Sequence, residues 1–516
     1  MRLSSKKKAT SFIMQTLEQI HNFKGKYPKQ IWSLFFSEMW ERFCFYGMRG
    51  MLVVFMISQL EFGEKEANLQ YGATQAFVYA FTFIGGLFAD KILGFRKSLF
   101  WGGLMMIIGS SLLGYDPHNF FFIGLAFIII GTGFFKPNIS TMVGELYKKG
   151  DPRRDAGFSL FYAGINLGAF LGGYICVAIG KGYMLSSVVP EDKRWNVAFA
   201  LAAVGMVISL INFHFTERHL GPIGLQPGHP DAIVKAKPKP KWVEYLVYVG
   251  TLAIIPLIDL MVSNPEYTDY FMYTIGPVTL IYLFWEMSKV SEKERKKLWA
   301  ALIFIVFSIL FWGIYEQSGG SLSIFAQKNL NDKLLGMTFD PNGVNNSAGA
   351  FFIIALAPLF GLMWIWMAKK KIEPNTIIKF GLGFIFLGLG YYLLFSTRLF
   401  HVAGMTSLDI FTIALLVITF GELCLSPIGL SIMTKLSPAK MQGIMMGMWF
   451  LASAYGQYVA GLIGASMAEA DENTPAVTRL MTYTDGYKML GIYALIAGVV
   501  LILLSPAIKK LMQEVR

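Results

Sequence analysis

IWSLFFSEMWERFCFYGMRGMLVVFMISQL, residues 31–60, is long enough to cross a bilayer as a helix, yet it carries two acidic and two basic side chains. A charge near the middle of a membrane helix costs at least about 2.5–3.5 kcal/mol, so several in one span require partners or a watery cavity. Glu38, Arg42 and Arg49 share one helical face because they are four and seven residues apart. The stretch therefore predicts an inward-facing helix that brings the acid pair Glu38 and Glu41, with two guanidinium groups, to membrane depth.

The composition of the chain indicates an all-α polytopic membrane protein. Of its 516 residues, 54% are hydrophobic and only 15% are charged, which is unlike a soluble globular domain. The formal net charge of +12 could suggest nucleic-acid binding, but the basic residues lie in short loops between apolar runs, where membrane-orientation signals belong. We therefore expect a lipid bilayer as the surroundings and no nucleic-acid partner.

Apolar runs of spanning length occur in the order six, two and six along the chain. Two such blocks are typical of a carrier with two pseudo-symmetric halves and a binding site between them. Basic residues favour the side that holds both termini, which predicts that both termini are cytoplasmic. The predicted units are a cytoplasmic N-terminal segment (1–30), a six-helix bundle (31–217), a solvated, proline-rich cytoplasmic linker (218–242), two additional helices with a loop (243–297) and a second six-helix bundle (298–516).

Three further charges lie inside predicted spans: Lys136, Glu316 and Glu422. Any one of them could be snorkelling to the interface or locked in a structural ion pair. Considered together, the cations belong to the first half and these two acids to the second, an arrangement that suits a cavity holding a zwitterion. Arg49 and Lys136 could bind a carboxylate, and Glu422 could bind an ammonium group.

Proton coupling is the energy source that the sequence favours. Glu38, Glu41 and Glu316 could exchange protons as salt bridges form and break. The sequence has no Walker-type nucleotide-binding loop, and no HExxH or GxSxG motif, so we expect neither an ATP-driven pump nor an enzyme. We expect no cofactor and no metal, with protons as the coupling ion.

Several uncharged side chains are weaker candidates for the site. Asn166 would be a costly buried amide without a partner, which favours a role in the site. Aromatic side chains could line the cavity, although aromatic residues in membrane helices more often face lipid or pack in the interior. These aromatic candidates are Phe45, Tyr46, Tyr79, Tyr162, Trp312 and Trp449.

EMWERFCFYGMR (38–49) resembles the ExxER motif and its tail in proton-dependent oligopeptide transporters, a branch of the major facilitator superfamily. The resemblance covers both halves in the right order, and the two extra spans are similar to those of bacterial members. It implies the superfamily fold of two six-helix bundles plus two additional helices, in a bacterial inner membrane. The other matching stretches are GGLFADKILGFRK (85–97), GFFKPNIS (133–140), FYAGINLGAFLG (161–172), FWGIYEQSGGS (311–321) and FGELCLSPIGLSIMTKLSP (420–438).

The resemblance implies symport of protons with dipeptides and tripeptides by alternating access, carried out by a monomer. Glu38, Glu41 and Arg42 would form the proton-coupling network, with Glu316 as a proton-sensitive partner. The residues implied in substrate binding are Arg49 and Lys136 for the peptide carboxylate, Asn166 and Glu422 for the amino group, Ser426 beside them, and Tyr46, Tyr79, Tyr162 and Trp449 in the pocket.

Two positions depart from the family pattern. Phe45 stands where many members have tyrosine. Gly349 and Ala350 stand where the family commonly has Asn-Pro, so an amide expected near the peptide amino group is missing. Asn345 or Asn346 could reach in instead.

Two other functions stay open from the sequence. A carrier of another small zwitterion or anion would use much of the same site, although an acid at 422 opposite a base at 49 favours a zwitterion. A non-transporting membrane receptor is the third, and its charges would be structural.

Overall fold

The computed structural model describes residues 16–148, 150–234, 237, 239–425, 429–438, 441–468 and 474–513. The described chain is almost entirely helical, apart from one antiparallel hairpin of two very short strands. Its elements are α1 (Leu17–His21), α2 (Gln30–Ser58), α3 (Glu64–Phe88), η1 (Ala89–Leu93), α4 (Phe95–Tyr115), α5 (Phe121–Glu145), α6 (Arg154–Gly180), η2 (Glu191–Lys193), α7 (Arg194–Thr216), η3 (Glu217–Leu220), α8 (Lys241–Ala253), α9 (Ile255–Ser263), α10 (Pro265–Met287), α11 (Glu292–Tyr315), α12 (Ser321–Asn329), β1 (Lys333–Leu334), β2 (Met337–Thr338), α13 (Pro341–Lys369), α14 (Thr376–Ser396), η4 (Thr397–Phe400), α15 (Leu408–Leu425), α16 (Gly429–Leu436), α17 (Gln442–Met467) and α18 (Ala476–Met512).

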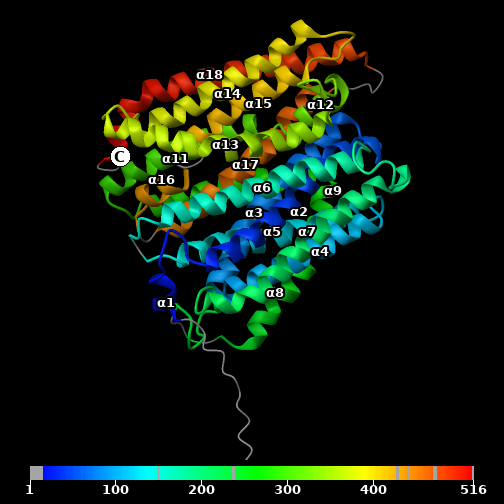
Figure 1. The fold of residues 1–516 in the computed structure, drawn as a ribbon. Helices are drawn as coiled ribbons and strands as arrows, with labels where there is room; N and C mark the ends of the chain where they lie inside the picture. Colours follow the sequence, from blue (N-terminus) through cyan, green and yellow to red (C-terminus); the bar gives the residue numbers. More distant parts are fainter. Residues whose placement is uncertain are drawn as a thin grey trace, which may run out of the picture.

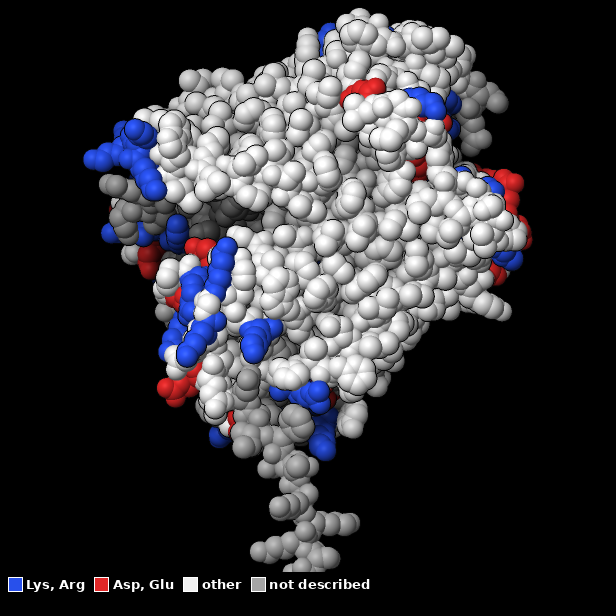
Figure 2. Space-filling view, viewed as in Figure 1, with Lys and Arg blue, Asp and Glu red and all other residues white. Residues whose placement is uncertain are grey.

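The helices are long enough to cross a membrane many times. Within the described residues, 11 helical segments are long and apolar enough to do so. The α2, α10 and α17 helices are also of spanning length, and α2 carries four charged side chains. With these three included, the order is six, two and six, which confirms the predicted architecture. Figure 2 shows a broad uncharged band on one face, with Lys and Arg gathered at its left end and both signs at its right end.

Two bundles lie one above the other in Figure 1. In the first bundle α2 packs against α6 and α7, and α4 packs against α5 and α7. In the second, α14 packs against α15 and α18, and α11 packs against α17. The bundles meet where α3 contacts α17 and where α6 contacts α13. Of the two additional helical segments, α9 lies against α3 and α5, whereas α10 contacts both α3 and α17.

The two bundles are held together tightly at the end that contains the α2–α3 connection. There Gly72 and Gly461 face each other so closely that a Cβ on either would lie 2.7 Å from the other's Cα. Lys181, which follows α6, forms an ion pair of 2.9 Å with Asp340, the N-cap of α13. Glu64, at the start of α3, pairs across the same junction with cations of the second bundle. We call this region the sealed end.

The first span of the second bundle is broken in the structure. The α11 helix ends at Tyr315, Glu316 is its C-cap, and α12 begins only at Ser321. Gly319 and Gly320 lie in the break, and a Cβ at Gly319 would overlap the hydroxyl of Tyr71 at 2.1 Å. The break therefore lets α3 approach the chain next to Glu316, and it places this carboxyl group at a helix end.

The linker also differs from the prediction, because part of it is packed rather than solvated. Leu220 and Ile223 are fully buried against the first bundle. Arg96, at the start of α4, donates hydrogen bonds to the backbone carbonyls of Gly221 and Ile223, and the amide of Gly224 donates to the Glu145 carboxylate. Proline and lysine in the rest of this segment suggest a solvated coil. Its first part is nevertheless docked on the first bundle by the buried side chains of Leu220 and Ile223 and by the hydrogen bonds from Arg96.

Candidate functional site

A cavity of about 310 Å³ lies between the two bundles, and charged side chains from both halves line it. From the first bundle come Glu38, Arg42 and Arg49 on α2 and Lys136 on α5. From the second come Glu316, at the end of α11, and Glu422, on α15. Three cations and three carboxylates thus line one cavity.

The acid pair on α2 shares a single guanidinium group. Arg42 Nε lies 3.0 Å from Glu38 Oε1 and also forms an ion pair with Glu41. All three side chains are almost completely buried, and Glu41 lies behind the cavity wall rather than on it. The guanidinium of Arg42 also lies over the ring of Phe45, 5.3 Å from its centroid. Two carboxylates and one cation give this group an excess of negative charge when all are ionised.

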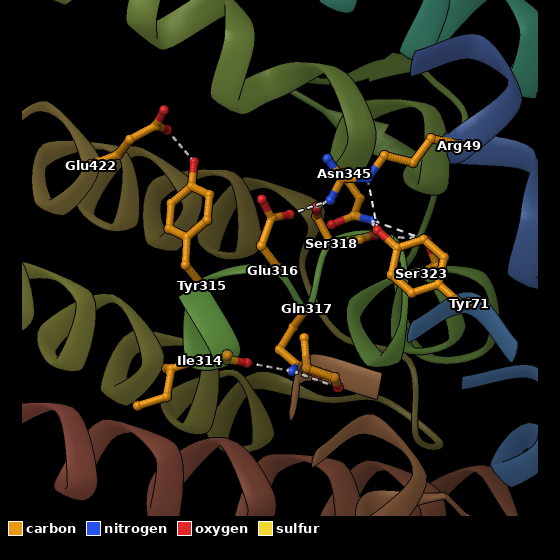
Figure 3. Close-up of polar contacts among 12 residues, drawn as sticks. Arg49, Tyr71, Ile314, Tyr315, Glu316, Gln317, Ser318, Ser323, Asn345 and Glu422 are labelled. Atoms are coloured by element: carbon orange, nitrogen blue, oxygen red, sulfur yellow. Dashed lines mark hydrogen bonds and ion pairs between the residues drawn. The ribbon is translucent and has the colours of Figure 1, made fainter. Parts of the chain in front are cut away.

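Arg49 joins the two bundles through an ion pair with Glu316 (Figure 3). Its Nε donates a hydrogen bond of 2.7 Å to the hydroxyl of Tyr71 on α3, and its Nη2 is 3.4 Å from the hydroxyl of Ser318. Arg49 and Glu316 are each less than a tenth exposed. A guanidinium held in this way connects α2, α3 and the break after α11, so its release would loosen all three elements.

Lys136 faces the cavity in a different manner. Its ammonium group lies over the ring of Tyr79, 4.3 Å from the centroid. Among the residues that the structure describes, no carboxylate lies within ion-pair distance of it. A lysine acts as a point charge with three donors, so Lys136 is available to an anionic group entering the cavity.

Glu422 is the corresponding group of opposite sign. Its carboxylate accepts hydrogen bonds from the hydroxyl of Tyr162 at 3.3 Å and from that of Tyr315 (Figure 3). Within the described part of the chain it has no cationic partner. A buried carboxylate that is bonded only to hydroxyl groups keeps its negative charge available to a cation.

The remaining predicted site residues fall into two groups. Five of them line the cavity: Tyr46, Tyr79, Tyr162, Asn166 and Trp312. Asn166 donates from its side-chain amide to the carbonyl of Tyr162, one turn earlier. Trp449 is buried but does not line the cavity, nor does Phe45. Ser426 lies outside the described residues.

Both asparagines considered as replacements on α13 line the cavity but are bonded within the second bundle. Asn346 donates to the carbonyl of Asn342 at 2.9 Å, and Asn345 donates to the carbonyl of Ser318 at 2.6 Å. Gly349 and Ala350 leave the next turn of α13 without a polar side chain, although both line the cavity. In this conformation the side-chain N–H groups of both asparagines are therefore engaged within the second bundle.

Two tyrosines in the site were not candidates from the sequence. Tyr71, on α3, is fully buried and holds Arg49, and Tyr315, at the end of α11, holds Glu422. Tyr315 directly precedes the candidate residue Glu316, so the sequence contains a signal that could have indicated it. Nothing local in the sequence points to Tyr71. Among the described residues, no cluster of His, Cys, Asp and Glu is arranged to hold a metal ion.

Comparison with known proteins extends over nearly the whole chain. The model of the POT family matches residues 96–480. The chain is 35% identical to the peptide transporter YePEPT of Yersinia enterocolitica, over 95% of this chain and 96% of that protein. It is 32% identical to a di-/tripeptide transporter of Lactococcus lactis subsp. cremoris, over 98% of this chain and 100% of the relative. A crystal structure of a mutant peptide transporter POT in complex with alafosfalin matches with a TM-score of 0.79 at 30% identity, covering 97% of this chain and 100% of that one.

Proposed function

This chain belongs to the POT family, and on that premise we propose that it is a symporter that imports dipeptides and tripeptides together with protons by alternating access. It is a multi-span membrane transporter with the fold of the major facilitator superfamily, as the sequence predicts. The relatives named above are peptide transporters, which supports this substrate class.

The observation that carries the proposal is the pair of available charges on opposite walls of the cavity. Lys136, on α5, has no carboxylate partner among the described residues, and Glu422, on α15, has only hydroxyl partners. A peptide with free ends is a zwitterion, so its carboxylate can bind Lys136 while its ammonium group binds Glu422. Such a ligand satisfies both charges at once, which a simple anion or a simple cation cannot do.

The cavity also suits a variable ligand between those charges. Its volume of about 310 Å³ is that of a small-ligand site. Tyr46, Tyr79 and Trp312 supply wide aromatic walls that can accept different side chains without requiring a specific hydrogen bond. Binding through the two ends and a tolerant middle is the chemistry expected for recognising many short peptides.

Protons enter the mechanism through the buried carboxyl groups. Glu38 and Glu41 share Arg42, so one added proton would balance the charge of this group. A second proton on Glu316 would remove the negative charge that holds Arg49, and Arg49 would then be free to bind the peptide carboxylate beside Lys136. Each charge moved down a potential of 100 mV releases about 2.3 kcal/mol, enough for roughly a 50-fold gradient.

Orientation follows from the basic residues. We place both termini in the cytoplasm of a bacterium and the protein in its inner membrane, working as a monomer. The sealed end, with Gly72 against Gly461 and Lys181 paired with Asp340, then faces outward. The structure accordingly corresponds to the state that is closed to the outside.

The test is uptake of labelled dialanine into liposomes that contain the purified protein, with and without an inward proton gradient. We expect the wild type to accumulate dialanine only with the gradient. Glu38→Gln combined with Glu41→Gln should lose accumulation but keep exchange of dialanine across the membrane, because the peptide site is intact. Glu191→Gln combined with Asp192→Asn changes two exposed carboxylates and should behave as the wild type. A wild type that exchanges dialanine but ignores the gradient would remove the proton assignment.

A further inference from the structure

The carboxylate of Glu422 is held by hydroxyl groups from both bundles. Tyr162, on α6, donates to Oε1 at 3.3 Å, and Tyr315, on α11, donates to Oε2. A phenol has one proton to donate and retains lone pairs that can accept. With its proton directed at Glu422, the hydroxyl of Tyr315 still has lone pairs that can accept, and Tyr162, Tyr315 and Glu422 all line the same cavity.

Tyr315 is fixed more firmly than an ordinary cavity tyrosine. Its ring stacks on Phe311 with centroids 5.7 Å apart and planes at 14°, and it meets the edge of Trp312 at 5.4 Å. It is the last residue of α11, and the next residue, Glu316, is tied to Arg49 (Figure 3). Its hydroxyl therefore has little freedom to leave Glu422 when a ligand arrives, since both its ring and its backbone are anchored.

The wall opposite this hydroxyl is bare. A Cβ at Gly349 would have the hydroxyl oxygens of Tyr315 and Thr419 as its nearest neighbours, each 4.0 Å away. The side-chain nitrogens of Asn345 and Asn346 donate to backbone carbonyls elsewhere. The hydroxyl groups of Tyr315 and Thr419 thus both border the open space on α13, and the hydroxyl of Tyr315 is the one that is bonded to Glu422.

We infer that Tyr315 is a specificity-determining residue for ligands with a free amino terminus, an inference that rests on the proposed function. Its hydroxyl donates to Glu422 and accepts from the ammonium group of the ligand, so the ammonium binds between a carboxylate and a phenol oxygen. This arrangement supplies, from α11, the acceptor that Gly349 cannot supply from α13. A ligand without an ammonium group gains nothing from it.

The experiment measures equilibrium binding of two matched compounds to the purified full-length protein. Dialanine has the ammonium group, and propionyl-alanine has the same shape with hydrogen in its place. In Tyr315→Phe we expect the affinity for dialanine to fall about tenfold, the effect of losing a hydrogen bond to a charged group, while the affinity for propionyl-alanine stays unchanged. Tyr392→Phe, which changes a half-exposed tyrosine on α14, is the matched control and should alter neither affinity.

A second variant separates this role from a structural one. Gly349→Asn, added to Tyr315→Phe, places a side-chain carbonyl in the open space and should restore part of the preference for dialanine. If Tyr315→Phe weakens both compounds equally, or neither, the inference is overturned. If the wild type binds neither compound, the proposed function fails and the inference fails with it, whereas binding of dialanine by the wild type with an unaltered preference in Tyr315→Phe would overturn the inference alone.

Discussion

Two buried ion clusters in this molecule are built from similar side chains but have opposite excesses of charge. On α2, Glu38 and Glu41 share Arg42, so two carboxylates meet one cation. At the sealed end the proportion is reversed, because one carboxylate meets two cations. The first cluster lies within a single helix of the first bundle, whereas the second joins the two bundles.

The carboxylate of the second cluster is Glu64, which is only 3% exposed at the start of α3. Its Oε1 lies 3.1 Å from Lys328 Nζ and 3.4 Å from Arg479 Nε, and its Oε2 accepts a hydrogen bond of 2.7 Å from Tyr483. These partners come from α12 and α18 of the second bundle. Both oxygens of Glu64 are thus engaged from the other half of the molecule.

The difference teaches what each cluster can do. A group with surplus carboxylate can take up a proton and become better balanced, so the α2 cluster is suited to proton exchange. A group with surplus cation gains nothing from a proton, so the Glu64 cluster holds the bundles together at any pH at which its carboxylate is ionised. Proton exchange is therefore assigned to the α2 cluster, and closure of the two bundles at the sealed end is assigned to the Glu64 cluster.

Removing Arg42 should have the largest effect. In Arg42→Met, two buried carboxylates lose their shared cation, and breaking a buried ion pair in this way costs about 3–5 kcal/mol. We expect a lower apparent melting temperature in detergent at pH 7.5 and no uptake of dialanine. At pH 5 part of the stability should return, because protons take the place of the missing positive charge.

The control is Lys97→Met, which breaks the surface ion pair of Lys97 with Glu244. Lys97 is 45% exposed, so this pair should contribute at most about 1 kcal/mol. An Arg42→Met protein that melts like Lys97→Met at both pH values would contradict the charge imbalance assigned to α2.

Removing Lys328 should have a smaller effect, although it also breaks a largely buried pair. In Lys328→Met, Glu64 keeps Arg479 and Tyr483, so the cluster becomes balanced rather than bare. We expect a loss of stability in thermal unfolding that is smaller than in Arg42→Met, with uptake retained, because Glu64 is left with a cation and a hydroxyl rather than bare. Lys333→Met, on the exposed hairpin, is the control, and a loss as large as that in Arg42→Met would show that the two clusters do not differ as described.

The smallest effect is expected at Asp151, in the loop between α5 and α6. Hydrogen bonds from Arg153 lower the pKa of this carboxyl group from 3.8 to about 2. Because the folded-state pKa is the lower one, the stabilisation is complete above the ordinary pKa and is lost only as the pH falls through about 2. Asp151→Asn should therefore leave the pH dependence of the melting temperature between pH 5 and 8 unchanged. A flattened profile in this variant would mean that surface loops, not the α2 cluster, set that dependence.

Local patterns were enough to predict the bundles and the α2 cluster. Glu38 and Arg42 are one helical turn apart, so their pairing follows from spacing alone, and the spans follow from hydropathy. The signs of the charges on each half can be read from the residues directly. The sequence could not show that Arg49 is engaged by Glu316, 267 residues away, because the partner of a buried charge depends on how the bundles meet.

Three features escaped prediction for the same physical reason. Glu64 lies just before the second apolar run of the chain, where a charged side chain suggests a solvated helix start, yet α12 and α18 bury it. Tyr71 is one of many tyrosines in apolar runs, and only the fold brings it to Arg49. The break after Tyr315 contains two glycines, Gly319 and Gly320, which the hydropathy of the span does not reveal.

The docked start of the linker has a consequence for dividing the gene into co-expressed fragments. Arg96 binds the carbonyls of Gly221 and Ile223, and Leu220 is buried, so residues up to about 224 belong to the first bundle as a folded unit. A fragment that stops at residue 217 would expose the apolar surface that Leu220 covers. It would also leave Arg96 without the two carbonyl groups that accept its hydrogen bonds. Gln226 still donates to the carbonyl of Ile92 and Ala232 is buried, so a cut or an inserted reporter belongs after residue 234.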